Sequence, residues 1–362
     1  MTPTGPGKAP GVADVVALGE SMVTFLPSRP GRLADVPSFE RSIGGAESNV
    51  ACALAAAGHT TRWVSRVGAD AFGDHLLATV ASYGVDVSAV RRDPARPTGV
   101  YFRTAGDRAG DGHEVAYYRA GSAASAMSAA NTDLDAVRTA RVLHLSGITA
   151  ALSRDCLGLM RELTARRPGR PLVSFDVNHR PELWRGGPGP GTLLELARGA
   201  DLVFVGEDEA RAAWGLHGAR AIREALPEPA TVVVKRGPGG AVALTGGTGT
   251  PPGAEAPRDA GGTAAFAPAL RVDVVSATGA GDAFAAGFLS ATLRGLPLPQ
   301  RLRHGHLTAA AVLTAPGDLA APPARGRADR LAALDDTAWG RLRLGPGWTG
   351  TAEGAEEEVP AP

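Results

Sequence analysis

The stretch SATGAGDAFAAGF, residues 276–288, places a glycine-rich turn and one acid directly before an apolar run that predicts a helix. The first turn of a helix has free backbone N–H groups and a positive dipole end, so it suits an anion. Asp282 then has two interpretations. It caps the helix, or it is a general base that takes a proton from an acceptor hydroxyl while nearby N–H groups stabilise a transferring phosphoryl group.

Two better-known phosphate motifs do not fit this stretch. No Gly-Lys-Ser/Thr follows at the spacing of a Walker A loop. Phe284 stands where a dinucleotide-binding fingerprint needs a small third residue. The motif by itself therefore leaves both interpretations of Asp282 open.

Around this stretch, short apolar runs typical of buried strands alternate with Ala- and Leu-rich helical patterns. The runs 15–20, 62–68, 141–147, 171–177, 201–206 and 231–237 predict strands, and 46–58 and 70–84 predict helices. This alternation predicts an α/β fold with a mostly parallel sheet and helices on both faces. Such sheets bind ligands at the carboxyl ends of their strands.

Other segments interrupt the alternation. Residues 22–45 and 98–121 predict a small antiparallel sheet that projects as a lid, and 246–266 predict a mobile insertion between two strands. Residues 1–12 are expected to be a disordered tail, and 336–362 a C-terminal extension with a disordered end. One domain, residues 13–335, is expected between them.

The composition excludes several classes of partner. The 37 Lys and Arg balance the 37 Asp and Glu, which argues against a nucleic acid or an anionic membrane as partner. Only Cys52 and Cys156 occur, so a reduced cytoplasm is the simpler location. We find neither an apolar signal-peptide core nor an apolar stretch long enough to cross a bilayer.

A second motif, SIGGAESN at residues 42–49, places two glycines before Asn49. Together with TGAGDAFAAGF (278–288), it resembles both signatures of the ribokinase-like (PfkB) carbohydrate kinases, over roughly residues 13–335. The resemblance implies a three-layer α/β/α domain with a β-sheet lid. YYRAGSAAS (117–125), LHLSGITAALS (143–153), FDVNHRPELW (175–184) and APGDLAAPP (315–323) are similar to the group that phosphorylates 2-keto-3-deoxygluconate. That group uses ATP and a divalent metal, here Mg²⁺, to phosphorylate the terminal hydroxyl of 2-dehydro-3-deoxy-D-gluconate.

The resemblance implies roles at matching positions. Asp282 is the catalytic base, and the anion hole consists of Gly279, Ala280 and Gly281. The substrate contacts, besides Asp282, are Gly44, Gly45, Asn49, Tyr101, Tyr117, Arg119, Arg180 and Asp318. The nucleotide contacts are Asn178, Arg180, Lys235, Gly237, Gly240, Gly279 and Gly281, and Glu209 acts indirectly on the metal.

Elementary chemistry agrees with these roles and also allows plainer ones. Glycines permit close approach, Asn can bond a hydroxyl as donor or acceptor, and Arg binds a carboxylate bidentately. The alternatives are a tight turn for the glycines, a solvated strand face for Tyr101, Tyr117 and Arg119, and a solvated strand end for Lys235.

Three positions depart from the family pattern, and two rival functions stay open. Ser276 and Gly206 stand where many relatives have Asp and Asn, and His306 where many have an Asn near adenine. These departures bear on metal geometry and nucleotide binding. The rivals are another sugar kinase of this fold, such as a fructokinase or ribokinase, and a non-catalytic sugar-acid sensor. The lid suggests a homodimer.

Overall fold

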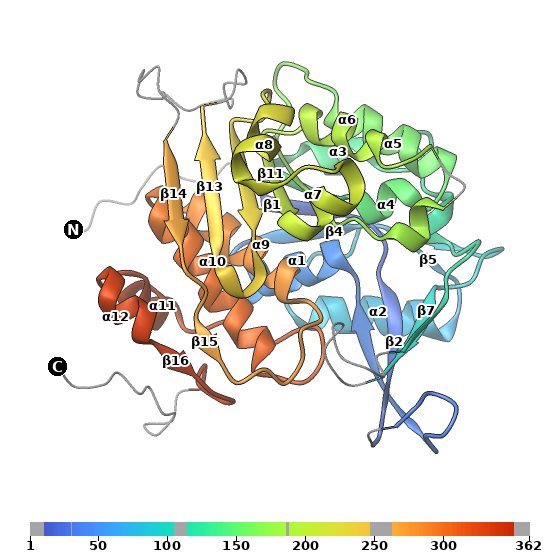
Figure 1. Ribbon diagram of the computed structural model, residues 1–362. Coiled ribbons are helices and arrows are strands. Elements are labelled where there is room, and N and C mark those ends of the chain that lie inside the picture. Colours follow the sequence, from blue (N-terminus) through green and yellow to red (C-terminus); the bar gives the residue numbers. More distant parts are fainter. Residues whose placement is uncertain (1–10, 30, 105–113, 186–187, 247–262, 351–362) are drawn as a thin grey trace, which may run out of the picture.

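An eight-stranded sheet with helices on both faces forms the centre of the molecule (Figure 1). The computed structural model describes residues 11–29, 31–104, 114–185, 188–246 and 263–350. In order across the sheet, the strands are β14 (Ala264–Ala267), β13 (Ala241–Thr245), β12 (Thr231–Lys235), β11 (Leu202–Gly206), β10 (Leu172–Asp176), β9 (Ala140–Ser146), β1 (Ala13–Leu18) and β4 (Thr61–Val64). The strands from β12 to β4 are parallel and only the β13 and β14 pairings are antiparallel, which confirms the predicted fold class.

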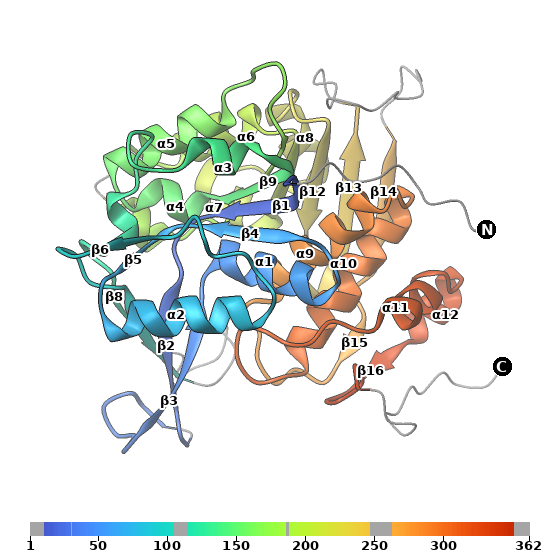
Figure 2. The same cartoon turned by 180° about the vertical axis from the view of Figure 1, so that it is seen from behind.

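Two apolar cores lie on the two faces of this sheet, because successive side chains of a strand point to opposite faces. In β11, Val203 and Val205 belong to one core, whereas Leu202 and Phe204 belong to the other. The first core is covered by α5 (Arg154–Thr164), α6 (Gly191–Gly199), α7 (Glu207–Trp214) and α8 (Gly218–Ala225). The second is covered by α1 (Ala46–Ala56), α9 (Ala280–Leu293) and α10 (Leu298–Leu313), as Figure 2 shows from behind.

A smaller four-stranded sheet projects beside the carboxyl ends of the parallel strands. Its order is β3 (Phe39–Gly44), β2 (Met22–Pro27), β7 (Val100–Arg103) and β8 (Val115–Tyr118). The two outer pairings are antiparallel, but β2 and β7 pair in parallel. The prediction of a purely antiparallel sheet was therefore wrong, because two separate hairpins meet at their first strands and run in the same direction.

The remaining elements complete the layers. They are α2 (Ala71–Ser82), α3 (Leu134–Arg138), α4 (Gly147–Ala151), α11 (Arg325–Ala332), α12 (Asp336–Arg341) and the strand pairs β5 (Arg66–Gly68) with β6 (Arg91–Asp93) and β15 (Arg271–Val272) with β16 (Arg343–Leu344). Beyond residue 335, Trp339 and Trp348 are buried against α10 and α11. Most of the predicted insertion at 246–266 lies outside the described residues. In the described part of the chain, no helix is both long and apolar enough to span a bilayer.

Candidate active site

A cleft of about 840 Å³ lies between the carboxyl ends of the parallel strands and the small sheet. It gathers side chains from the lid, the start of α1, the ends of β10, β11 and β12, and the turn before α9. The predicted site residues that line it are Gly44, Gly45, Asn49, Tyr101, Tyr117, Arg119, Asn178, Arg180, Glu209, Lys235, Gly237, Gly279, Gly281, Asp282 and Asp318. Segments that are far apart in sequence thus meet in one site.

Two predicted residues do not line this cleft. Ala280 lies in the first turn of α9, and its amide donates to the carbonyl of Ala277 at 3.4 Å. Gly240 has a φ of 96°, and a Cβ there would clash with the backbone of Ala267 and Pro268. Close packing of the start of β13 against the end of β14 therefore explains why glycine stands at position 240.

Asp282 lies in the first turn of α9, where it is half-buried at the floor of the cleft. The Nδ2 of Asn49, in α1, donates to Asp282 Oδ2 at 2.9 Å. Burial raises the pKa of Asp282 to about 7, although the Asn49 hydrogen bond and the charge of Lys235 act in the opposite direction. The helix N-cap is Gly279 rather than Asp282, so the carboxylate is not needed to cap α9.

Gly279 gives the turn before α9 its shape. Its φ of 81° lies in the left-handed region, and a Cβ would clash with the backbone of Asp318. Glycine is therefore required for both conformation and space. The first turn of α9, with Gly281, opens into the cleft, and the first amides of a helix have no intrahelical acceptor. This end of α9 can accept an anion.

Lys235 ends β12 and forms an ion pair with the buried carboxylate of Asp176 at the end of β10. Its Nζ donates to the two carboxylate oxygens of Asp176 at 2.8 and 3.0 Å. Burial alone lowers the pKa of Lys235, but Asp176 and then Glu209 outweigh this effect and raise it. Lys235 is consequently a firmly charged ammonium beside Gly281, and the sequence analysis had not assigned Asp176 to this site.

Asn178, Arg180 and Glu209 form the wall of the cleft next to Lys235. Asn178 has a positive φ of 42°, and its Oδ1 is buried without a hydrogen-bond partner among the described residues. Positive φ in a residue other than Gly is uncommon and concentrates at functional sites. Arg180 lies 3.6 Å from Glu209, whose other carboxylate oxygen accepts from the amide of Gly206 at 3.0 Å.

The carboxylates of Asp208 and Glu209 suit Mg²⁺ that is bound together with nucleotide phosphates. Among the described residues, no group of three or more His, Cys, Asp or Glu is arranged to hold a metal ion. Mg²⁺ in kinases is commonly bound by one or two carboxylates together with substrate phosphates. Asp208 and Glu209 both line the cleft and supply such oxygens.

The lid side of the cleft contains residues that the sequence analysis missed. Arg103 donates to Asp318 Oδ1 at 2.7 Å, and the hydroxyl of Tyr101 donates to Asp318 Oδ2 at 2.8 Å. Arg119 pairs with the buried carboxylate of Glu20. Alternation along β7 was the signal that could have found Arg103, since residues two apart in a strand share a face.

Two of the departures from the family pattern lie outside the cleft lining. Ser276 is buried, and its Oγ has no hydrogen-bond partner in the described structure. His306 is buried in α10, where Nε2 lies 3.1 Å from the carbonyl of Ala267 and the ring packs edge-on against Phe284. Burial lowers the pKa of His306 to about 4, so it is a neutral core residue. The third departure, Gly206, lines the cleft.

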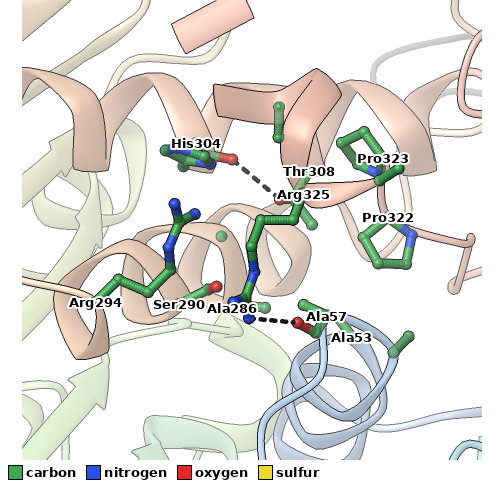
Figure 3. Close-up of a pocket in the computed structure, with 14 residues that line it drawn as sticks. Ala53, Ala57, Ala286, Ser290, Arg294, His304, Thr308, Pro322, Pro323 and Arg325 are labelled. Atoms are coloured by element: carbon green, nitrogen blue, oxygen red, sulfur yellow. Dashed lines mark hydrogen bonds between the residues drawn. The ribbon is translucent and has the colours of Figure 1, made fainter. Parts of the chain in front are cut away.

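A second, smaller pocket of about 120 Å³ is lined by residues of α1, α9, α10 and α11 (Figure 3). Its lining includes Ser290, Arg294 and Arg325, and Figure 3 shows Arg325 reaching the carbonyl of Ala57 at the end of α1. It contains none of the predicted site residues. The larger cleft is therefore the candidate active site.

Comparison with known proteins agrees with this geometry. Residues 12–325 match the pfkB family of carbohydrate kinases. The chain is 36% identical over 326 residues to the 2-dehydro-3-deoxygluconokinase of Bacillus subtilis (strain 168), covering 86% of this chain and 93% of that protein. It is 31% identical to the 2-dehydro-3-deoxygluconokinase of Thermoproteus tenax, covering 90% and 96%. An uncharacterized sugar kinase from Pyrococcus horikoshii in complex with ATP superposes with a TM-score of 0.72 at 25% identity, covering 86% of this chain and 96% of that one.

Proposed function

Because the chain belongs to the pfkB family of carbohydrate kinases, we propose that it phosphorylates 2-dehydro-3-deoxy-D-gluconate with ATP. The product is 2-dehydro-3-deoxy-6-phosphogluconate. The observation that carries the proposal is Asp282, which lies in the first turn of α9 and accepts a hydrogen bond from Asn49. It faces a cleft whose lining includes Arg119 and Arg180, which can bind an acidic substrate. The similarity to two 2-dehydro-3-deoxygluconokinases over most of the chain supports this acceptor.

The cleft suggests how this chain would perform the transfer. The acceptor hydroxyl binds at Asp282, whose carboxylate is oriented by the hydrogen bond from Asn49. Asp282 then acts as a general base and takes the hydroxyl proton. The amides around Gly279 and Gly281, with the ammonium of Lys235, face the charge of the transferring phosphoryl group. Asn178 and Gly237 would contact the nucleotide. Mg²⁺, held by Asp208 and Glu209 with the phosphates, would neutralise phosphate charge.

Arginines in the cleft favour an acidic acceptor over a neutral sugar. Arg180 has one distant carboxylate neighbour, Glu209 at 3.6 Å, and keeps further N–H donors for a ligand. Arg119 is already paired with Glu20, so it would share its guanidinium between Glu20 and the substrate. A guanidinium presents a planar fork that matches a carboxylate.

The small sheet also supports a homodimer. Phe25 and Phe102 stack with ring centroids 4.7 Å apart, and Phe39 and Tyr118 pack edge-on against Phe102. Tyr118 is 65% exposed, which is unusual for an aromatic side chain within such a cluster. An exposed aromatic face of this kind suits a second copy of the chain. A cytoplasmic location, expected from the cysteine content, stays a prediction.

A panel of sugars and sugar acids with ATP, followed by coupled detection of ADP, tests the proposal. We expect 2-dehydro-3-deoxy-D-gluconate to give the highest kcat/KM, with Asp282→Asn as the inactive control. A higher kcat/KM for fructose or ribose would overturn the proposed acceptor but would still support a sugar kinase. Binding of the sugar acid without ADP release would favour the sensor instead.

A further inference from the structure

Asp318 joins the lid to the turn that precedes α9. Its two carboxylate oxygens accept one hydrogen bond each from the lid strand β7, from Arg103 at 2.7 Å and from Tyr101 at 2.8 Å. The Arg103 and Asp318 side chains are each only 4% exposed. All three residues line the cleft. Residues 215 positions apart in sequence therefore form one buried ion pair at the wall of the acceptor site.

Two glycines leave room for this arrangement. A Cβ at Gly44 would clash with the Tyr101 hydroxyl and the Asp318 carboxylate. A Cβ at Gly279 would clash with the backbone of Asp318. The position of Asp318 is thus set on one side by the lid and on the other by the turn of the predicted anion hole. Both glycines occur in the two sequence motifs that first pointed to the site.

We propose that Arg103 is a positioning residue that orients the Asp318 carboxylate toward hydroxyl groups of the acceptor sugar acid, and so sets acceptor affinity. This inference rests on the proposed function. A carboxylate has about four acceptor positions, and the lid occupies one on each oxygen. One position on each oxygen remains for a ligand. Arg103 holds one carboxylate oxygen in place, and Tyr101 holds the other and so determines the rotation of the carboxylate.

A purely structural role explains the pair less well. Burying an ion pair is often no more stabilising than apolar packing of the same volume. Stability alone therefore gives little reason to bury Arg103 and Asp318 at the wall of a cleft. Orientation of a ligand-binding carboxylate does give a reason, since hydrogen bonds to a charged group depend strongly on its placement.

The test compares Arg103→Met with a matched control. Arg66→Met breaks another Arg–Asp pair, with Asp93 at 2.8 Å, in which the Asp is buried but neither residue lines the cleft. We expect Arg103→Met to raise KM for the sugar acid by about 10-fold or more, with KM for ATP changed by less than about 2-fold. We expect Arg66→Met to lower Tm without changing either KM. Equal changes of the sugar-acid KM in both variants would overturn the proposal.

A double-mutant cycle separates action through Asp318 from a direct effect. If Arg103 acts through Asp318, Arg103→Met combined with Asp318→Asn should be no worse than Asp318→Asn alone. Additive losses would contradict this. Arg103→Lys, which keeps the charge but not the fork, is the second variant should Arg103→Met fail to fold. Its sugar-acid KM should rise above that of the wild type, and an unchanged KM would count against the proposal.

The experiments distinguish a failure of the proposed function from a failure of the positioning role of Arg103. The wild-type acceptor panel identifies the acceptor, and the cycle is then measured with that acceptor, whichever sugar it is. If the wild type releases no ADP with any sugar, calorimetric Kd values for 2-dehydro-3-deoxy-D-gluconate replace KM. An Arg103→Met variant that binds as tightly as wild type would then refute the positioning role.

Discussion

Asn49 and Asp282 lie 233 residues apart in sequence, yet the Asn49 amide donates to the Asp282 carboxylate at 2.9 Å. The bond joins the first turns of α1 and α9, which pack side by side beneath the cleft. It leaves the second carboxylate oxygen of Asp282 available to a ligand. The same bond opposes the effect of burial on the pKa of Asp282. Orientation and proton affinity of the proposed base are therefore linked through one amide.

The activity should depend on pH through Asp282. Burial raises the pKa of Asp282 to about 7, and only the ionised carboxylate can take the hydroxyl proton. We expect kcat/KM for the sugar acid to increase with pH, with a midpoint near 7. Initial rates from about pH 5.5 to about pH 9, with the coupling enzymes in excess, measure the profile. A flat profile over that range would speak against Asp282 as the base.

Asn49→Ala should shift this profile to higher pH. The Asn49 hydrogen bond lowers the pKa of Asp282, so its loss lets burial raise the pKa further. Activity lost near neutral pH should therefore partly return in alkaline buffer. Asn131→Ala is the control, since Asn131 only bridges Ser128 and Ala126 in a turn away from the cleft. An Asn49→Ala profile with an unchanged midpoint would contradict the pKa argument.

Residues with recognisable local chemistry could be predicted from the sequence. The glycine turn before Asp282, the second motif with Asn49 and the strand ends with Asn178 and Lys235 all lie at the cleft. Glycine, Asn and carboxylate patterns mark such positions because they depend on local backbone geometry and on the chemistry of one side chain.

Contacts between distant segments could not be predicted in this way. The pairs of Arg103 with Asp318 and of Lys235 with Asp176 depend on which strands become neighbours. Gly240 shows the converse difficulty, because the backbone of Ala267 already requires glycine there, whether or not a ligand also contacts it. Close packing and ligand approach both select glycine, so sequence alone does not separate them.

Replacing Asp282 with Asn should remove activity and improve stability at alkaline pH. Loss of a general base reduces kcat by about 10²–10⁴-fold. In the folded protein the pKa of Asp282 is raised from 3.8 to about 7, so the fold favours the neutral carboxyl. The free energy of unfolding contributed by this group therefore falls as pH rises between those two values.

Thermal unfolding measures this trade-off. Asp282→Asn should have a higher Tm than wild type at about pH 8, and the difference should shrink at about pH 5, where Asp282 is itself neutral. Asp35→Asn, at an exposed position paired with Arg32, is the control and should change neither Tm nor kcat. A variant that is less stable than wild type at both pH values would contradict the burial argument.

Lys235→Met should lower the rate of phosphoryl transfer while it leaves binding of the sugar acid intact. The Lys235 ammonium lies beside Gly281 and is held by both oxygens of Asp176, so it is placed at the proposed anion hole. Removal of one group that stabilises transition-state charge costs about 10²–10³-fold in kcat.

Arg236→Met is the matched control, because Arg236 is the next residue, is exposed and pairs with Glu207 outside the cleft lining. Steady-state kinetics with each substrate varied in turn should therefore show a fall in kcat for Lys235→Met alone, with KM for the sugar acid unchanged. If Lys235→Met keeps wild-type kcat, the ammonium serves only to neutralise Asp176.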